Sequence, residues 1–462
     1  MVRNKKVRIE WGMIATIFAL AWPTMLEQLM QTAVQYIDTA MVGSLGTHAT
    51  AAVGSTTTVN WLVNSSISAM GVGFLAFIAK SLGAGKKDLA RRASAQSVLA
   101  VIVSGVFFTV LTLSLSSFVP VWMQVDSEIQ SLAARYFFIL YSPMLFRAAI
   151  IIFGTTLRAA GDTKTPMLVG VLVNVINVAL NFLLIYPVRT LSIFDLSFTM
   201  WGADLGVEGA ALASAVSFVV GGVLITVSVF RHKEISPKGY SVKPDKEILV
   251  PCLRVALPNM LQRFATSFGY VAFASMINSL GEISTAAHTI ANTVESAFYI
   301  PGYGMQTAAA TLAGNALGAK DEKRLHSLAR MIIFIETVLM IISGTLLFIF
   351  APFMMSLFSK DAQVIMLGAV VLRMVAVSEP FYGVSIVIEG MLQGLGKTVT
   401  PFVFNIIGMW GVRIVGTFIC VTFFHMGLVS AWACMIIHNL LLFVMFLVHW
   451  LRGKWNPFLQ KT

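Results

Sequence analysis

The chain has 462 residues, of which 57% are hydrophobic and only 11% are charged. Soluble domains carry about 25% charged residues, so the composition excludes an ordinary soluble protein and predicts a polytopic helical membrane protein. The formal net charge of +11 would also suit a nucleic-acid partner, so the positions of the basic residues must decide between the two.

The hydrophobic runs between polar breaks predict twelve membrane-spanning helices. In chain order they cover residues 12–42, 50–81, 88–116, 128–156, 164–187, 205–230, 247–279, 285–316, 323–354, 362–392, 398–423 and 427–451. Several runs exceed the ~20 residues that a span needs, so we expect tilt or extension beyond the bilayer. The predicted fold is an all-α membrane protein.

The two halves of the chain repeat one another at a fixed offset. Pro23 returns as Pro258, Gly46 as Gly281 and Gly161 as Gly396, each 235 residues later. A repeat of this length indicates a duplicated half-protein, which in membranes is typical of transporters. We therefore expect an N-terminal lobe over 1–230, a linker over 231–246 and a C-terminal lobe over 247–462. Because each lobe has six spans, the lobes should be related by a pseudo-two-fold axis along the membrane normal.

Basic residues concentrate on one side of the predicted topology. That side includes the turn at residues 86–92 and the linker at 231–246, whereas the opposite loops carry only Arg189 and Lys360. The positive-inside rule places both termini in the cytoplasm, in a multi-pass protein of the plasma membrane. The positive charge then faces anionic lipid headgroups, so we expect the bilayer as a partner and no nucleic acid.

Two motifs stand out in the first half of the chain. The first helix ends in Asp38-Thr39-Ala40-Met41-Val42-Gly43, and a later loop reads Gly161-Asp162-Thr163-Lys164-Thr165-Pro166. Both resemble motifs of the multidrug and toxic compound extrusion (MATE) transporters. Each motif alone is weak, but the pair at this separation in a duplicated twelve-span chain is fairly specific. The resemblance extends over nearly the full length. It implies export of bulky, mostly cationic drugs in exchange for inward-moving protons or sodium ions.

The resemblance also implies where the coupling ion binds. The family has its coupling carboxylate at the position of Asp38, with Asn177 and Asn181 beside it and a hydroxyl at Ser214 nearby. Asn177 and Asn181 are four residues apart and share a helix face, and amide oxygens suit a hard cation. Some relatives have an Asp where Asn181 stands, so the choice between proton and sodium stays open.

Each of these residues also has a structural interpretation. Asp38 would then be an interfacial acid near the outer end of its helix. The two asparagines would join helices by hydrogen bonds, and Ser214 would serve close packing. An ionisable group inside a span is costly to bury and points to function, so we favour the coupling site. Apart from sodium at Asp38, Asn177 and Asn181, we expect no metal and no cofactor.

Four other acids lie in or near predicted spans: Glu27, Glu295, Glu379 and Glu389. Glu27 lies about three helical turns before Asp38, on nearly the same face. Glu27, Glu379 and Glu389 are candidate acids of the transport cleft. Alternatively, Glu27 neutralises Arg147 or Arg263, and the later acids pair with Arg263 or Arg413.

Other function classes have less support. A lipid-linked oligosaccharide flippase of the same superfamily should need a strongly cationic cleft for a pyrophosphate, and no intramembrane cluster of Arg and Lys stands out. A membrane enzyme should show a catalytic constellation, and none is found. The sequence therefore favours a monomeric multidrug antiporter for small organic cations, without enzymatic activity.

Overall fold

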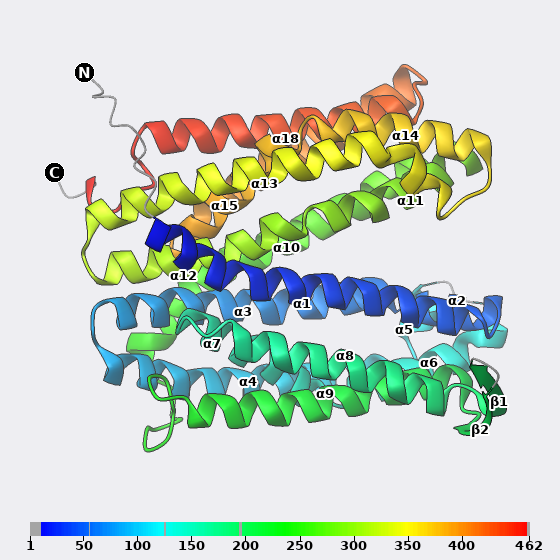
Figure 1. The fold of residues 1–462 in the computed structure, drawn as a ribbon, viewed down its shortest axis with the longest axis horizontal. Coiled ribbons are helices and arrows are strands. Elements are labelled where there is room, and N and C mark those ends of the chain that lie inside the picture. Colours follow the sequence, from blue (N-terminus) through cyan, green and yellow to red (C-terminus); the bar gives the residue numbers. More distant parts are fainter. Residues whose placement is uncertain (1–10, 55, 124–125, 194–195, 460–462) are drawn as a thin grey trace. The chain divides into compact units, whose positions relative to one another are not determined.

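The computed structural model describes residues 11–54, 56–123, 126–193 and 196–459, and most of them are helical (Figure 1). The described chain divides into two compact units. The N-terminal unit comprises residues 26–78 and 86–267, and the C-terminal unit comprises residues 1–25, 79–85 and 268–462. The predicted division at residues 231–246 stays a prediction. The expected cytoplasmic N-terminus at residues 1–10 lies outside the described residues.

The helices of the first half follow the predicted hydrophobic runs. They are α1 (Trp11–Gly43), α2 (Thr47–Gly54), α3 (Thr57–Gly83), α4 (Lys87–Leu115), α5 (Val119–Trp122), α6 (Ser127–Tyr141), α7 (Met144–Ala159), α8 (Lys164–Leu184) and α9 (Gly206–Arg231). The span predicted at 128–156 is divided into two helices, α6 and α7, which meet at an angle of 49°. Pro143, which cannot donate a backbone hydrogen bond, lies at this break.

The second half shows the same relation between sequence and structure. Its helices are α10 (Lys246–Asn278), α11 (Glu282–Phe298), α12 (Ile300–Gly318), α13 (Glu322–Ser356), α14 (Ala362–Ala376), α15 (Glu379–Gly394), α16 (Val399–Ile406), α17 (Val415–Phe418) and α18 (Leu428–Leu451), with π-helices η1 (Ile407–Ile414) and η2 (Ile419–Phe423). Prolines again mark the breaks. Pro301 follows the junction of α11 and α12, and Pro380 follows the 56° bend between α14 and α15.

A short β-hairpin joins α8 to α9. Strand β1 (Pro187–Ile193) pairs antiparallel with β2 (Leu196–Ala203), where the sequence analysis expected only a loop. The segment is rich in β-branched and aromatic residues, which favour strands. Strand pairing also satisfies backbone groups that a long irregular loop would leave open.

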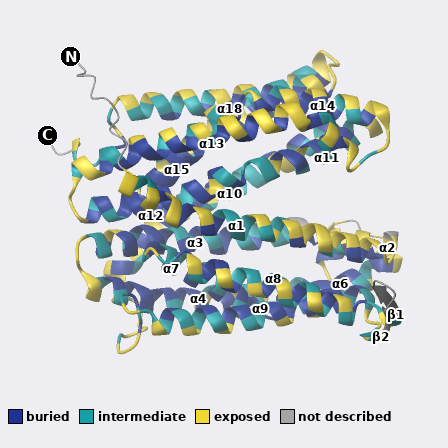
Figure 2. Ribbon diagram, in the orientation of Figure 1, coloured by how far each residue is buried: buried dark blue, intermediate teal, exposed yellow. Residues whose placement is uncertain are grey.

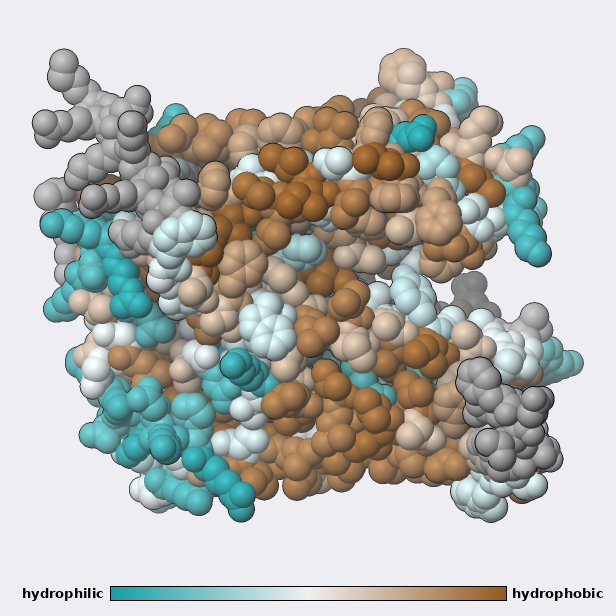
Figure 3. Space-filling view, in the orientation of Figure 1, coloured by the Kyte–Doolittle hydropathy of each residue, from teal (hydrophilic) through white to brown (hydrophobic). Residues whose placement is uncertain are grey.

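Hydrophobic surface covers the middle of the helices in each unit, and hydrophilic residues gather toward the helix ends (Figure 3). Many large apolar side chains are exposed, among them Phe107, Leu168 and Phe353, while others pack inside each unit (Figure 2). Among the described residues, eight helices are long and apolar enough to cross a membrane, or ten if each bent pair is one span. This pattern is that of a multi-pass membrane protein.

Glycines bring helices together inside each unit. A Cβ on Gly209 of α9 would lie 2.5 Å from the carbonyl oxygen of Leu184 in α8. A Cβ on Gly394 of α15 would collide with the carbonyl oxygen of Ala310 in α12. Small residues permit such backbone approach in membrane helices, and the contact between α8 and α9 also positions polar side chains described below.

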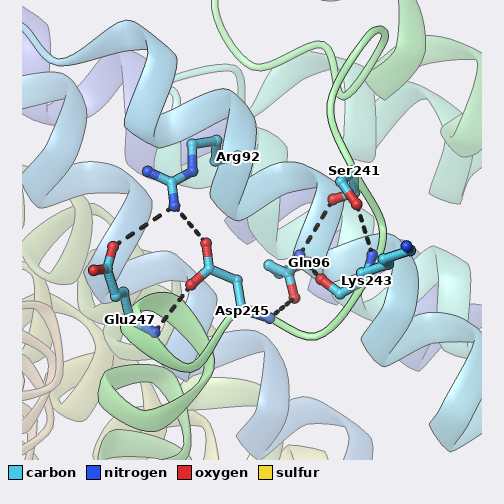
Figure 4. Close-up of polar contacts among 6 residues, drawn as sticks. All are labelled: Arg92, Gln96, Ser241, Lys243, Asp245 and Glu247. Atoms are coloured by element: carbon cyan, nitrogen blue, oxygen red, sulfur yellow. Dashed lines mark hydrogen bonds and ion pairs between the residues drawn. The ribbon is translucent and has the colours of Figure 1, made fainter.

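The linker between α9 and α10 is bound to the N-terminal unit (Figure 4). Arg92 of α4 forms ion pairs with Asp245 at 2.6 Å and Glu247 at 3.6 Å. The Gln96 side chain donates to the carbonyl oxygens of Ser241 and Lys243 and accepts from the backbone N–H of Asp245. The linker is therefore attached to α4 rather than being a free spacer.

Candidate ion-coupling site

The N-terminal unit brings together four polar side chains from three helices. Asn181 of α8 donates from Nδ2 to Oδ1 of Asp38 in α1, at 2.6 Å. Asn177, one turn earlier on α8, lies 2.9 Å from Oγ of Ser214 in α9. The two asparagines lie on one face of α8, and both amides lie close to Asp38.

The orientation of the Asn177 amide determines how this cluster is bonded. The amide position that faces Asp38 is 3.0 Å from Oδ1 and 3.1 Å from Oδ2. With nitrogen in that position, Asn177 donates to both carboxylate oxygens and accepts from the Ser214 hydroxyl at 2.9 Å. With oxygen in that position, Asn177 accepts a hydrogen bond from Nδ2 of Asn181 at 3.2 Å. Its oxygen then also faces the two carboxylate oxygens, and a proton or cation between them would relieve that repulsion.

The hydrogen bonds between Asp38 and the two asparagines are largely shielded from solvent. Asn177 and Asn181 are 6% and 1% exposed, respectively, and Asp38 is half-buried. Tyr136 of α6 is also buried and interacts electrostatically with Asp38. The ion pairs recorded among the described residues do not include Asp38. Among the residues that the structure describes, the hydrogen bonds to this carboxylate come from amide groups, which leaves room for a small cation to bind.

The donor set suits either candidate ion. The two oxygens of Asp38 and the Oδ1 atoms of both asparagines are hard oxygen ligands of the kind that alkali and alkaline-earth cations prefer. Oδ1 of Asn181 is buried and has no hydrogen-bond partner in the described part of the chain. The same carboxylate can instead take a proton and donate it to an amide oxygen. The arrangement therefore fits reversible binding of a proton or a sodium ion.

Glu27 has a structural partner that the sequence analysis missed. Arg158, in the last turn of α7, donates from Nη2 to Oε2 of Glu27 at 2.5 Å. Arg147, one of the predicted partners, instead donates to Oδ1 of Asn60 at 2.5 Å. Glu27 also packs against Gly170 of α8, where a Cβ would lie 3.3 Å from its Cγ. Its proposed role as a cleft acid stays a prediction.

The acids predicted in the second half have different surroundings. Glu389 accepts hydrogen bonds from Gln393 and Asn405. Glu295 and Glu379 are buried and interact electrostatically with each other. The ion pairs found among the described residues include none between these acids and Arg413. The sequence analysis missed Glu336, which is fully buried beside them; its position within the apolar run of α13 was the available signal.

Comparison with known proteins identifies the family. The chain matches the MatE family over residues 23–183 and 258–419. The chain belongs to this family. Both halves of the chain are matched separately, which agrees with the internal repeat.

Relatives and solved structures match over almost the whole chain. The probable multidrug resistance protein NorM of Thermotoga maritima is 28% identical, over 95% of this chain and 92% of its own length. The probable multidrug resistance protein YoeA of Bacillus subtilis is 25% identical, over 89% and 87%. A crystal structure of a MATE protein in complex with MaL6 is 25% identical and covers 97% of both chains, with a TM-score of 0.88. An outward-facing MATE family transporter has the same TM-score at 24% identity, covering 99% of this chain and 100% of its own.

These similarities confirm the predicted fold class, a helical membrane protein with the twelve helices and two lobes of MATE transporters. They also support the expectation that the protein is a transporter rather than an enzyme, at the level of the family. They do not assign roles to Asp38, Asn177, Asn181 or Ser214, which stay predictions supported by the geometry above.

Proposed function

We propose that this MatE protein is a multidrug antiporter that exports bulky organic cations by alternating access and takes up protons or sodium ions in exchange. The names of its relatives, probable multidrug resistance proteins, support drug export. The single observation that carries the coupling mechanism is the contact of Asp38 with the amides of Asn177 and Asn181. Glu389 also accepts hydrogen bonds from two amides, those of Gln393 and Asn405, but the motif shared with the MATE family points to Asp38.

The side-chain amide of Asn177 can reverse its orientation when an ion binds at Asp38. When Asp38 is ionised and free, the amide nitrogen faces it and Ser214 donates to the amide oxygen. When a proton or sodium ion binds, the amide oxygen faces Asp38 and Ser214 becomes the acceptor, at the same 2.9 Å separation. Ion binding in α1 thereby changes the hydrogen bond that α8 makes with α9.

Exchange follows if this rearrangement favours one conformation of the transporter and drug binding favours another. Two ligands that bias one equilibrium in opposite directions are coupled, and the coupling is reciprocal. Shifting a two-state equilibrium from 1:99 to 99:1 requires about a 10⁴-fold difference in affinity between the states. Smaller differences still give exchange, with less complete coupling.

We further propose that the protein lies in the plasma membrane as a monomer with both termini in the cytoplasm. The basic turn before α4 and the basic linker before α10 lie on the same predicted side, which supports this orientation. Labelling of single cysteines introduced at Lys238 and Lys360 with a membrane-impermeant reagent tests it. Only the second position should react in intact cells.

The coupling mechanism is tested in proteoliposomes that hold a fluorescent organic cation, with sodium and pH gradients imposed separately. We expect Asp38→Asn to abolish gradient-driven efflux, because the variant carries no charge to exchange, while the protein remains folded. Glu128→Gln is the matched control, since Glu128 is an exposed acid of α6 in the same unit. It should transport as the wild type does.

The sodium and pH arms identify the coupling ion. Efflux that responds to only one gradient assigns that ion to the Asp38 site. Vigorous gradient-driven efflux by Asp38→Asn would overturn the assignment of the coupling role to Asp38.

A further inference from the structure

The segment that follows α18 turns back onto the C-terminal unit, near the end where α13 begins (Figure 1). This segment, residues 452–459, is called the docked segment below. Gly453 makes the turn with a φ of +67°, a conformation that favours glycine. Two side chains of the docked segment are then buried, Trp455 with 2% and Asn456 with 0% of its surface exposed. A polar side chain is buried at low cost only where it is hydrogen-bonded, so the docking site is specific.

Aromatic packing holds the docked segment against two helices. The ring of Trp455 stacks on that of Trp450 in the last turn of α18, with ring centres 4.0 Å apart and planes 2° from parallel. The ring of His326, in α13, meets Trp455 edge to face, with ring centres 5.1 Å apart. Lys397, between α15 and α16, donates from Nζ to the carbonyl oxygen of Lys454 at 2.9 Å. The docked segment therefore joins α13, α18 and the turn before α16.

The hydrogen bonds of Asn456 fix the protonation state of His326. Asn456 donates from Nδ2 to Oε1 of Glu322 at 3.0 Å, and its Oδ1 accepts from the backbone N–H of Phe458 at 2.9 Å. The reversed amide would place oxygen against a carboxylate and nitrogen against a donor, so these contacts set its orientation. Nδ2 of Asn456 also lies 2.9 Å from Nε2 of His326. An amide nitrogen only donates, so Nε2 must accept, which requires a neutral imidazole with its proton on Nδ1.

Protonation of His326 conflicts with this arrangement. The side chains of His326 and Glu322 are 37% and 45% exposed, so protons reach them from water, and Nε2 lies 3.7 Å from Oε1 of Glu322. A protonated Nε2 is a donor, so it faces the amide donor of Asn456 and competes with that amide for Glu322. Reversal of the amide would restore a bond to His326 but break those with Glu322 and Phe458. The other charged and titratable groups around the docked segment are Arg330, Lys397, Lys454 and His449.

We propose that the docked segment is a pH-sensitive latch, which fastens the start of α13 to the end of α18 while His326 is neutral and is released when His326 takes up a proton. Release frees these two helix ends to move independently, as a rearrangement of packed helices requires. On the predicted topology this end of the helices faces the cytoplasm, so acidification of the cytoplasm opens the latch. This inference goes beyond the proposed function, because docking of the segment depends neither on Asp38 nor on a transported drug.

Electron paramagnetic resonance of the full-length protein in liposomes tests the proposal. A nitroxide label is attached at Leu459→Cys, whose native side chain is 54% exposed, after the three native cysteines are replaced by Ala. We expect the mobile fraction of the label to rise severalfold from about pH 8 to about pH 5, the range over which His changes its charge. In His326→Gln an uncharged amide oxygen accepts from Asn456 at every pH, so the label should stay immobilised. His449→Gln, the matched control at the neighbouring histidine of α18, should keep the pH response.

Two further variants keep the result decisive. If His326→Gln does not fold, Asn456→Ala replaces it, and its label should be mobile at about pH 8 already and change little in acid. Asp38→Asn should keep the pH response, so failure of the coupling proposal would leave this inference standing. A pH response that persists in folded His326→Gln would overturn the latch. So would a wild-type label that becomes less mobile in acid, because attraction between protonated His326 and the ring of Trp455 would then outweigh the lost hydrogen bonds.

Discussion

Asp38 and Glu336 are carboxyl groups within membrane-spanning helices, yet their surroundings differ in kind. Asp38 is half-buried and lies against the amide groups of Asn177 and Asn181. Glu336 is fully buried and has no donor within the described residues. The amides around Asp38 stabilise its ionised carboxylate. The apolar surroundings of Glu336 disfavour an ionised carboxylate.

The difference teaches that burial and hydrogen bonding must be considered together. A buried polar group without a partner costs free energy, while amide donors recover much of that cost. The surroundings of Asp38 therefore stabilise the ionised carboxylate. The surroundings of Glu336 instead favour a neutral carboxyl group.

The largest effect should follow from giving the Asp38 site a second carboxylate. Asn181→Asp places an acid where Nδ2 now lies 2.6 Å from Asp38. Two carboxylates at about 4 Å repel by about 4 kcal/mol at an effective dielectric constant of 20, and a bound cation relieves this repulsion. We expect the sodium concentration for half-maximal efflux to fall at least about tenfold, which corresponds to about 1.4 kcal/mol. Efflux from proteoliposomes across a range of sodium concentrations measures it.

The matched control is Asn181→Ala, which removes the donor without adding charge. It should weaken the response to sodium and pH gradients alike, because Asp38 loses its shortest hydrogen bond. An unaltered sodium requirement in Asn181→Asp would show that Asp38 and residue 181 do not share an ion.

The sequence predicted the fold well because membrane helices follow hydrophobic runs closely. The breaks at Pro143 and Pro380 and the β-hairpin at residues 187–203 were missed, since they depend on tertiary contacts as well as on local composition. The resemblance to MATE transporters implied that Asn177 and Asn181 lie beside Asp38, and their spacing predicted only that the two asparagines share a helix face. The contacts of Glu27 with Arg158 and of Glu336 with two glycines join helices distant in sequence, which spacing along one helix cannot reveal.

A smaller effect should follow from supplying Glu336 with a donor. Gly302→Ala places a methyl group about 3.1 Å from Oε1 of Glu336 and 3.3 Å from Cδ1 of Ile386, and overpacking of this kind costs about 1–3 kcal/mol. Gly302→Ser adds the same carbon with a hydroxyl that can donate to Glu336, which should recover about 1 kcal/mol. Thermal unfolding of both variants in one detergent measures the difference. If Gly302→Ala and Gly302→Ser lowered the unfolding temperature equally, the added hydroxyl would bring no benefit, and Glu336 would not lack a hydrogen-bond donor.

The smallest effect should come from an ion pair between the first residue of α4 and the linker, which provides the solvent-exposed reference for both buried sites. Lys87 and Glu234 are joined at 2.8 Å, with side chains 59% and 41% exposed. The hydrogen bond from Lys87 lowers the pKa of Glu234, with smaller contributions from His232 and Arg91. Exposed pairs contribute about 0–1 kcal/mol and are screened by salt.

Because the pKa of Glu234 is lower in the folded protein than in the unfolded chain, the pair stabilises the fold above the unfolded pKa. This contribution is lost as the pH falls through the folded pKa. Lys87→Met should therefore reduce the free energy of unfolding slightly at neutral pH and low salt, and not at all in acid. Denaturant unfolding of the variant and the wild type at both pH values measures this. Water surrounds an exposed charge, so such a charge should tolerate the loss of its partner far better than a buried charge does. If Lys87→Met lowered the free energy of unfolding at neutral pH as much as Gly302→Ala does, solvent would not be screening the pair.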